Sequence, residues 1–210
     1  MTYSQWLAGL KALTDTRDAA RLWRERRFDF AYRLGEELAG PRGDQSAVQG
    51  SVVYGIWLSW GLLYIGQTTE ASRRLRDLPV GESHHLANTF PPEIWDRIVI
   101  VNWPSLPQAQ AVLQDVDRNL VGLALEHRLQ LRLKPLVNAY RRTSDGGWRS
   151  IDWSTSKSRG ARAATNLGEL GQQVDELWDV ASNHEVGDAE LPPSVRCIRP
   201  GTLLKSIGSY

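Results

Sequence analysis

The sequence predicts an α/β protein of the α+β type, with a small, mainly antiparallel three-stranded sheet flanked by helices. Two short β-rich runs within residues 51–67 are separated by a turn-like Ser-Trp-Gly, which is typical of a β-hairpin. A third β-branched run, 96–103, stops at Pro104. Helical patterns surround these runs, but the chain lacks the regular strand–helix alternation that a parallel sheet requires.

Residues 1–49 are expected to form a helical N-terminal extension. Apolar residues recur at helical spacing in two runs, one from Trp6 to Leu13 and one from Leu22 to Leu38. The second run carries the basic stretch RLWRERR at 21–27. Residues 40–50 are rich in glycine and polar side chains, and their composition predicts a linker.

Residues 50–140 are expected to form the central domain, which contains the hairpin and the strand 96–103. A short helix is predicted after the hairpin, with Thr68 or Thr69 as its cap and Pro79 at its end. A long helical pattern follows at 106–134, and Gly122 is the expected point of a break within it.

Residues 141–210 are expected to be a C-terminal extension of mixed character. Residues 126–162 hold nine Lys or Arg against three acids, whereas residues 166–190 hold seven acids and no Lys or Arg. The acidic block carries an apolar stripe that predicts a helix, and LPPSVRCI at 191–198 predicts a last strand. We expect the acidic block to face away from nucleic acid or to cover the basic surface of another subunit.

Bulk composition narrows the class of protein. The net charge is +1, from 25 basic and 24 acidic side chains, so any nucleic-acid site must be a local patch. The single cysteine excludes disulfide scaffolds and four-cysteine zinc sites within one chain. Because the sequence shows no secretory signal and no membrane-spanning run, a cytoplasmic location is expected.

Two tyrosines in the predicted hairpin carry a recognisable pattern. Val52-Val53-Tyr54 is followed, ten residues after Tyr54, by Tyr64-Ile65-Gly66. This pair of triplets resembles the signature of the GIY-YIG nuclease superfamily, with VVY where GIY is usual. The resemblance extends to Arg74 on the following helix, Glu126 on a later helix and Asn138 in KPLVN, and so covers residues 50–140.

The resemblance implies a catalytic domain that hydrolyses DNA phosphodiester bonds with one divalent ion, Mg²⁺ or Mn²⁺, bound by Glu126. Mg²⁺ keeps several of its waters, so a single carboxylate can suffice. Arg74 is implied to bind the scissile phosphate through its planar guanidinium. Tyr54 would orient or deprotonate the attacking water, Tyr64 would share that network, and Asn138 would fix the geometry.

One position departs from the family. Many members carry a histidine one turn after the arginine, where this chain has Leu78. His84 and His85 follow in a predicted loop, and we take His85 as the catalytic candidate for proton transfer. The alternative is that both are surface loop histidines. His127 lies on a different helical face from Glu126 and is expected to be structural.

The basic part of the C-terminal extension is the candidate nucleic-acid-binding region, since basic groups neutralise phosphates and aromatic rings can stack on bases. The alternative is that this charged stretch is only a solvated face. The candidate residues are Arg141, Arg142, Trp148, Arg149, Lys157 and Arg159.

The favoured function is a metal-dependent endonuclease acting on duplex DNA, in its preferred version a restriction or other phage-defence enzyme. The first alternative is a catalytically inactive module that keeps the GIY-YIG fold for binding nucleic acid. The second is an unrelated interaction protein in which the motif is coincidental. A symmetric cut of duplex DNA would require either a homodimer or two sequential nicks.

Overall fold

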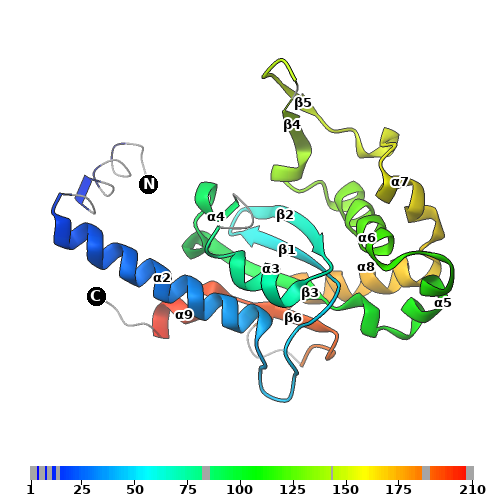
Figure 1. Cartoon of the computed structure of the whole chain (residues 1–210), viewed down its shortest axis with the longest axis horizontal. Helices are drawn as coiled ribbons and strands as arrows, with labels where there is room; N and C mark the ends of the chain where they lie inside the picture. The colour runs from blue at the N-terminus through cyan, green and yellow to red at the C-terminus, as the bar shows by residue number, and fades with distance from the viewer. Residues whose placement is uncertain are drawn as a thin grey trace.

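The computed structural model describes residues 4, 8, 11–12, 15–81, 86–142, 144–185 and 190–206. Its main sheet is antiparallel throughout, with strand order β2-β1-β3-β6 (Figure 1). The strands are β1 (Val52–Leu58), β2 (Gly61–Thr68), β3 (Trp95–Val101) and β6 (Val195–Ile198). The α+β class and the hairpin are confirmed, and the segment predicted as the last strand adds a fourth strand beside β3.

One face of the sheet is covered by helices from both ends of the chain. These are α2 (Arg17–Ala39), α3 (Ala71–Asp77), α4 (Leu86–Thr89) and α9 (Pro200–Ser206). Alternate strand residues such as Tyr54, Ile56 and Ile100 pack here against Leu34 and Leu75 of the helices. The N-terminal and C-terminal segments therefore share this core with the central segment.

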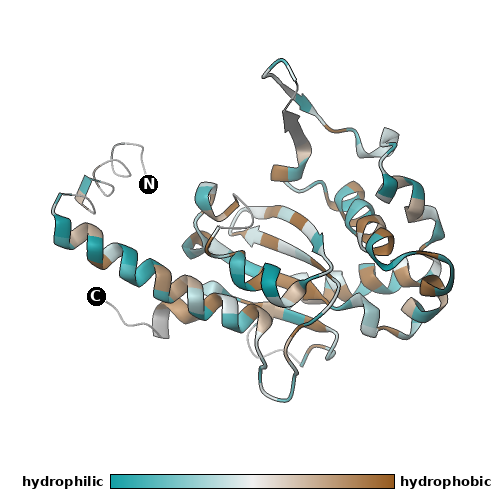
Figure 2. Ribbon diagram, viewed as in Figure 1, coloured by the Kyte–Doolittle hydropathy of each residue, from teal (hydrophilic) through white to brown (hydrophobic). Residues whose placement is uncertain are grey.

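The opposite face packs against α5 (Pro107–Asp115), α6 (Arg118–Leu133) and α8 (Gly168–Asn183). Figure 2 shows apolar residues on the strands and on these helices. A Cβ atom on Gly55 of β1 would lie 2.6 Å from Cζ2 of Trp178. Glycine at this position therefore allows the fully buried indole of α8 to close onto the sheet.

The long helical pattern at 106–134 is broken earlier than predicted. Helix α5 ends at Asp115 and α6 begins at Arg118. The side chain of Asp117 accepts hydrogen bonds from the amides of Asn119 and Leu120, so this residue caps α6. Gly122, the expected break, lies inside α6, where a Cβ would be 2.8 Å from Oε1 of Gln67.

Two helix starts differ from the predicted ones. The cap residue of α3 is Glu70, and Thr68 instead accepts the Glu70 amide through Oγ1. Helix α2 begins at Arg17, where Thr16 accepts the amide of Ala19. The apolar run predicted from Trp6 to Leu13 lies mostly outside the described residues.

A second, two-stranded sheet formed by β4 (Tyr140–Arg142) and β5 (Trp148–Ser150) was absent from the sequence prediction. The hairpin extends away from the main body (Figure 1). Helix α7 (Arg159–Ala163) follows it and lies against α6. Short 3₁₀ turns are η1 (Pro92–Ile94), η2 (Trp103–Ser105), η3 (Val137–Ala139), η4 (Trp153–Thr155) and η5 (Ala164–Asn166).

A buried arginine joins the C-terminal strand to the end of the long N-terminal helix. Arg196 of β6 is 4% exposed, and its Nη1 donates to the backbone carbonyls of Glu37, Leu38 and Gly40. These carbonyls lie at the C-terminus of α2, where a cation interacts favourably with the helix dipole. Within the described part of the chain, no helix combines the length and apolarity needed to cross a membrane.

Candidate active site

The candidate site gathers around β2, the edge strand of the main sheet. Tyr54 of β1 pairs with Gly66 of β2, and Tyr64 is two residues earlier on the same strand. The two tyrosines are therefore diagonal neighbours on one face of the sheet. Their ring centroids are 6.1 Å apart with an interplanar angle of 44°. The structure thus brings together the two phenols that the sequence singled out.

Tyr54 is buried and Tyr64 is partly buried, and burial is the largest influence on the ionisation of both phenols. Tyr54 is 1% exposed, and burial raises its pKa to about 12, against the smaller lowering effect of the positive charge of Arg74. Burial likewise raises the pKa of Tyr64, and the neighbouring Tyr54 and Glu126 add to this effect. Both phenols are consequently neutral at physiological pH in the free protein.

A hydrogen bond joins the two hydroxyl groups. It lowers the pKa of Tyr54 and raises that of Tyr64, so it favours ionisation of Tyr54 before Tyr64.

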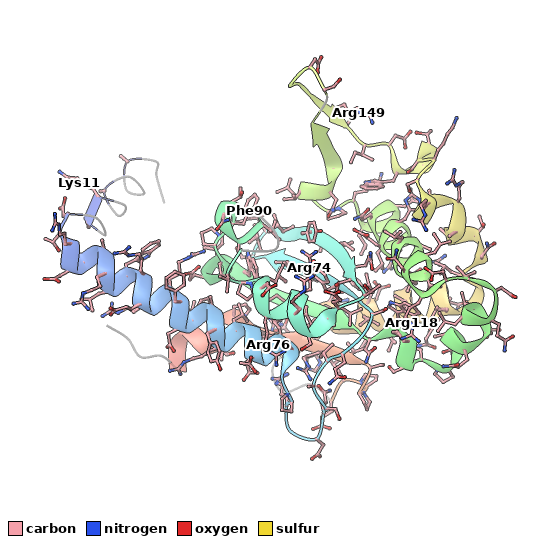
Figure 3. All side chains as sticks on the ribbon, in the orientation of Figure 1. Lys11, Arg74, Arg76, Phe90, Arg118 and Arg149 are labelled. Carbon is pink, nitrogen blue, oxygen red and sulfur yellow. The ribbon has the colours of Figure 1, made fainter. Side chains whose placement is uncertain are left out.

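Two oppositely charged side chains act on this phenol pair from different helices. Arg74 projects from α3, and Glu126 from α6, and the charges of both influence both phenols. Helix α3 is held in place by burial of Leu75 and by an ion pair of 2.6 Å between Nε of Arg76 and Oε1 of Glu36 on α2. Figure 3 marks Arg74 on this helix. The arrangement offers a guanidinium, a carboxylate and two phenols at one place.

Side-chain amides hold α6 and the following turn against the free edge of β2. Asn138 accepts the amide of Ile65 through Oδ1 at 2.9 Å and donates to the carbonyl of Ile65 through Nδ2 at 3.2 Å. Nε2 of Gln130 donates to the same carbonyl at 3.1 Å and to Oε1 of Glu126 at 3.0 Å. These bonds satisfy backbone groups that an edge strand otherwise exposes.

Steric contacts explain why the last residue of the Tyr64-Ile65-Gly66 triplet is a glycine. A Cβ on Gly66 would lie 2.6 Å from Cε1 of Tyr64 and 2.9 Å from Oη of Tyr54. The rings of the two tyrosines therefore lie across the backbone of Gly66, and no larger residue fits between them without displacing one ring.

The histidine predictions have different outcomes. Leu78 occupies the position at which the resembled nuclease superfamily often carries a histidine. It is fully buried among the apolar residues between the sheet and α2. His84 and His85 lie outside the described residues, so the role of His85 stays a prediction. His127 is buried on α6 and meets the ring of Trp153 edge-on at 5.9 Å. Burial lowers the pKa of His127.

The donor set fits one kind of divalent cation. Among the described residues, no group of three or more His, Cys, Asp or Glu is placed to hold a metal. A single, partly buried carboxylate beside neutral phenols suits a hard cation that takes most of its ligands from water and phosphate. The residues present therefore fit Mg²⁺ or Mn²⁺ at Glu126.

The predicted nucleic-acid-binding residues follow the candidate site along the chain. Arg141, Arg142 and Trp148 occupy the β4–β5 hairpin, but their side chains are outside the described part. Arg149, Lys157 and Arg159 are exposed, and Figure 3 marks Arg149 on the hairpin. The hairpin begins two residues after Asn138, which is bonded to the backbone of Ile65, so its base lies near β2, the strand that carries Tyr64.

The acidic block covers a basic surface of its own chain. Asp175 of α8 pairs with Arg128 at 2.7 Å and with Arg132 at 3.4 Å, and Asp179 pairs with Arg132 at 2.7 Å. Both arginines lie on α6. The basic character of residues 126–162 is thus partly neutralised within the chain. Of the other described cations in this stretch, those that are exposed are Lys134, Arg149, Lys157, Arg159 and Arg162.

No protein-family model, curated protein or solved structure matches this chain.

One contributor to the site was not singled out from the sequence. Gln130 lies one turn after Glu126 on a helix whose neighbouring positions are apolar. A polar residue on a buried helical face needs a partner, and this is the signal that could have drawn attention to it.

Proposed function

We propose that this protein is a metal-dependent endonuclease that hydrolyses DNA phosphodiester bonds at the site formed by Tyr54, Tyr64, Arg74 and Glu126. The observation that carries the proposal is the convergence of Arg74 and Glu126, from separate helices, on one pair of phenols. Gln130 joins Glu126 to the carbonyl of Ile65, the residue after Tyr64. Packing of the tyrosines alone requires neither charge, and an ionised group close to an apolar core is costly unless it is paired or hydrogen-bonded.

Each side chain has a chemical task in this proposal. The guanidinium of Arg74 binds the scissile phosphate and offsets the charge that develops on its oxygens. Glu126 would hold the divalent cation, which when bound stabilises negative charge on the phosphate and the leaving oxygen. Asn138 keeps the turn after α6 fixed to the strand of Tyr64.

The protonation state of Tyr54 favours one of its two roles. With a pKa of about 12, the phenol is neutral near pH 7 and acts as a hydrogen-bonding group that orients the attacking water. The role of general base requires an additional positive charge next to the hydroxyl. The hydrogen bond between the two hydroxyl groups restricts the orientation of both phenols.

Duplex DNA is the proposed substrate, and a restriction or other phage-defence enzyme is the proposed biological version. The exposed cations on the β4–β5 hairpin and around α7 support this choice, because cations on a ribbon beside the reactive groups can follow the DNA backbone. A two-stranded ribbon also fits the width of the major groove. Action on both strands requires a homodimer or sequential nicks.

The second candidate function is a catalytically inactive nucleic-acid-binding module. The buried Leu78, where the resembled family places a histidine, favours this candidate. The two functions differ in their dependence on Glu126, since a binding module tolerates its loss.

The deciding experiment is cleavage of supercoiled plasmid and mixed phage genomic DNA with Mg²⁺ or Mn²⁺. Glu126→Gln and Tyr54→Phe are compared with the control Glu176→Gln. Glu176 is an exposed helical carboxylate that also accepts a hydrogen bond from a glutamine one turn away. We expect cleavage by the wild type and the control, and a loss of at least 100-fold in both site variants. Equal DNA binding by all four proteins without any cleavage would favour the binding module.

A further inference from the structure

Gln130 makes a bridge from the candidate metal ligand to the central sheet. Its side chain is 4% exposed, although glutamine is ordinarily a surface residue. Nε2 donates to Oε1 of Glu126 at 3.0 Å and to the carbonyl of Ile65 at 3.1 Å. The amide nitrogen carries two hydrogens, so both bonds form at once.

The far end of the bridge is rigid. Ile65 lies within β2, directly after Tyr64, and its peptide groups are also held by both polar atoms of Asn138. The bridge thereby fixes the orientation of the Glu126 carboxylate relative to the backbone of β2, the strand that carries Tyr64. Motion of α6 relative to β2 would break the bridge.

We propose that Gln130 is a positioning residue that orients the Glu126 carboxylate for cation binding. This inference rests on the proposed function, because it assumes that Glu126 is the metal ligand. Fixing the rotamer of a glutamate costs conformational entropy. The bridge moves that cost from cation binding to folding, which is the general benefit of preorganisation.

The chemical type of residue 130 supports a positioning role. A lysine or arginine here would pair with Glu126 and compete with a bound cation. A neutral amide orients the carboxylate but leaves its charge available to the cation. Furthermore, Asn138 also donates to the Ile65 carbonyl, so covering the edge of β2 does not by itself require Gln130.

The test uses the full chain and two variants that remove the donor with different packing, Gln130→Met and Gln130→Ala. The matched control is Gln172→Met, because Gln172 donates to Oε1 of Glu176 at 2.9 Å on the exposed side of α8. Mn²⁺ affinity is measured by electron paramagnetic resonance, together with the Mg²⁺ concentration for half-maximal cleavage. Thermal unfolding without cation reports the integrity of the fold.

We expect Mn²⁺ affinity to fall about 10- to 100-fold in the Gln130 variants, the usual effect of losing a partner of a metal ligand. The Mg²⁺ requirement should rise in parallel, and the control should match the wild type. Wild-type Mn²⁺ affinity in a folded Gln130 variant would overturn the inference, as would unfolding of both variants, which assigns Gln130 to stability alone. Mn²⁺ binding that ignores Glu126→Gln would instead overturn the metal site of the proposed function.

Discussion

Tyr54 and Tyr64 lie diagonally across the β1–β2 ladder, 6.1 Å apart between ring centroids, with a hydrogen bond that joins their hydroxyl groups. Two phenols in one hydrogen-bonded pair titrate together: the bond lowers the pKa of Tyr54, whereas Tyr54 raises the pKa of Tyr64. The pair therefore links the protonation of the candidate site to the stability of the sheet that carries it.

This linkage predicts a loss of stability at alkaline pH. The folded pKa of Tyr54, about 12, is above the usual value, so its contribution is complete below about pH 10 and is lost as pH rises toward 12. By pH 11, the free energy of unfolding should have fallen by about 1 kcal/mol through this group. Tyr54→Phe should reduce the slope in urea unfolding experiments between pH 9 and 11.

The control for this prediction is Tyr32→Phe, because Tyr32 is 68% exposed on α2. It should leave the pH dependence of unfolding unchanged. Equal slopes for the wild type and Tyr54→Phe would contradict the assignment of Tyr54 as a buried, neutral phenol.

Gly66→Ala should disrupt the phenol pair directly. The added methyl group would lie 2.6 Å from a ring carbon of Tyr64 and 2.9 Å from the Tyr54 oxygen, so at least one ring must move. We expect a loss of about 1–3 kcal/mol in the free energy of unfolding, typical of overpacking. The cleavage rate should fall even where the variant is fully folded, because the two phenols are displaced. Urea unfolding and initial rates measure the two effects separately.

Gly201→Ala is the matched control, since a Cβ at Gly201 meets nothing within 4 Å. Wild-type stability and cleavage in Gly66→Ala would show that the tyrosine rings do not occupy the positions described.

The local parts of this fold could be predicted from the sequence, because their signals are local. The hairpin follows from β-branched runs around a turn. The apolar stripe from Leu167 to Trp178 predicted α8, which begins directly after Leu167 and buries the rest of the stripe. The turn at Asp117 was missed because Gly122 was the more obvious helix breaker, although the aspartate cap was readable.

Long-range contacts could not be predicted in the same way. The strand at 195–198 was expected, but its pairing with β3 depends on a core formed by segments about a hundred residues apart. Gln130 gains its role only from Ile65, which is 65 residues away in sequence. The strands of the β4–β5 hairpin have three residues each, too few for periodicity to identify.

The ion pairs of α6 and α8 predict which basic residues contribute to DNA binding. Arg149→Ala and Lys157→Ala should each lower DNA affinity and reduce the slope of log affinity against log salt by about one unit. Arg132→Ala should leave the slope unchanged, because Arg132 is already paired with Asp175 and Asp179. Fluorescence anisotropy with labelled duplex and the Glu126→Gln protein measures all three slopes without cleavage.

An equal reduction by Arg132→Ala would mean that the pairs with α8 open on binding and that the basic face of α6 also meets DNA. No change in any variant would remove the hairpin from the proposed contact surface.

The last prediction concerns Arg196, which joins β6 to the C-terminus of α2. Its guanidinium donates to the carbonyls of Glu37, Leu38, Gly40 and Ser46, and burial lowers its pKa. Arg196→Met would leave buried carbonyls unpaired, each costing about 1–3 kcal/mol. We expect a total loss of the order of 3 kcal/mol in urea unfolding.

Arg42→Met is the control. About half of the Arg42 side chain is exposed, and it forms an ion pair of 3.5 Å with Glu37. Exposed ion pairs contribute little, so this variant should unfold near the wild-type midpoint. Helix α2 covers the face of the sheet on which Tyr54 lies. Arg196→Met should therefore also reduce cleavage at temperatures where a fraction of the variant molecules is unfolded. Similar stability for the two variants would contradict a role for Arg196 in holding the end of α2 to the sheet.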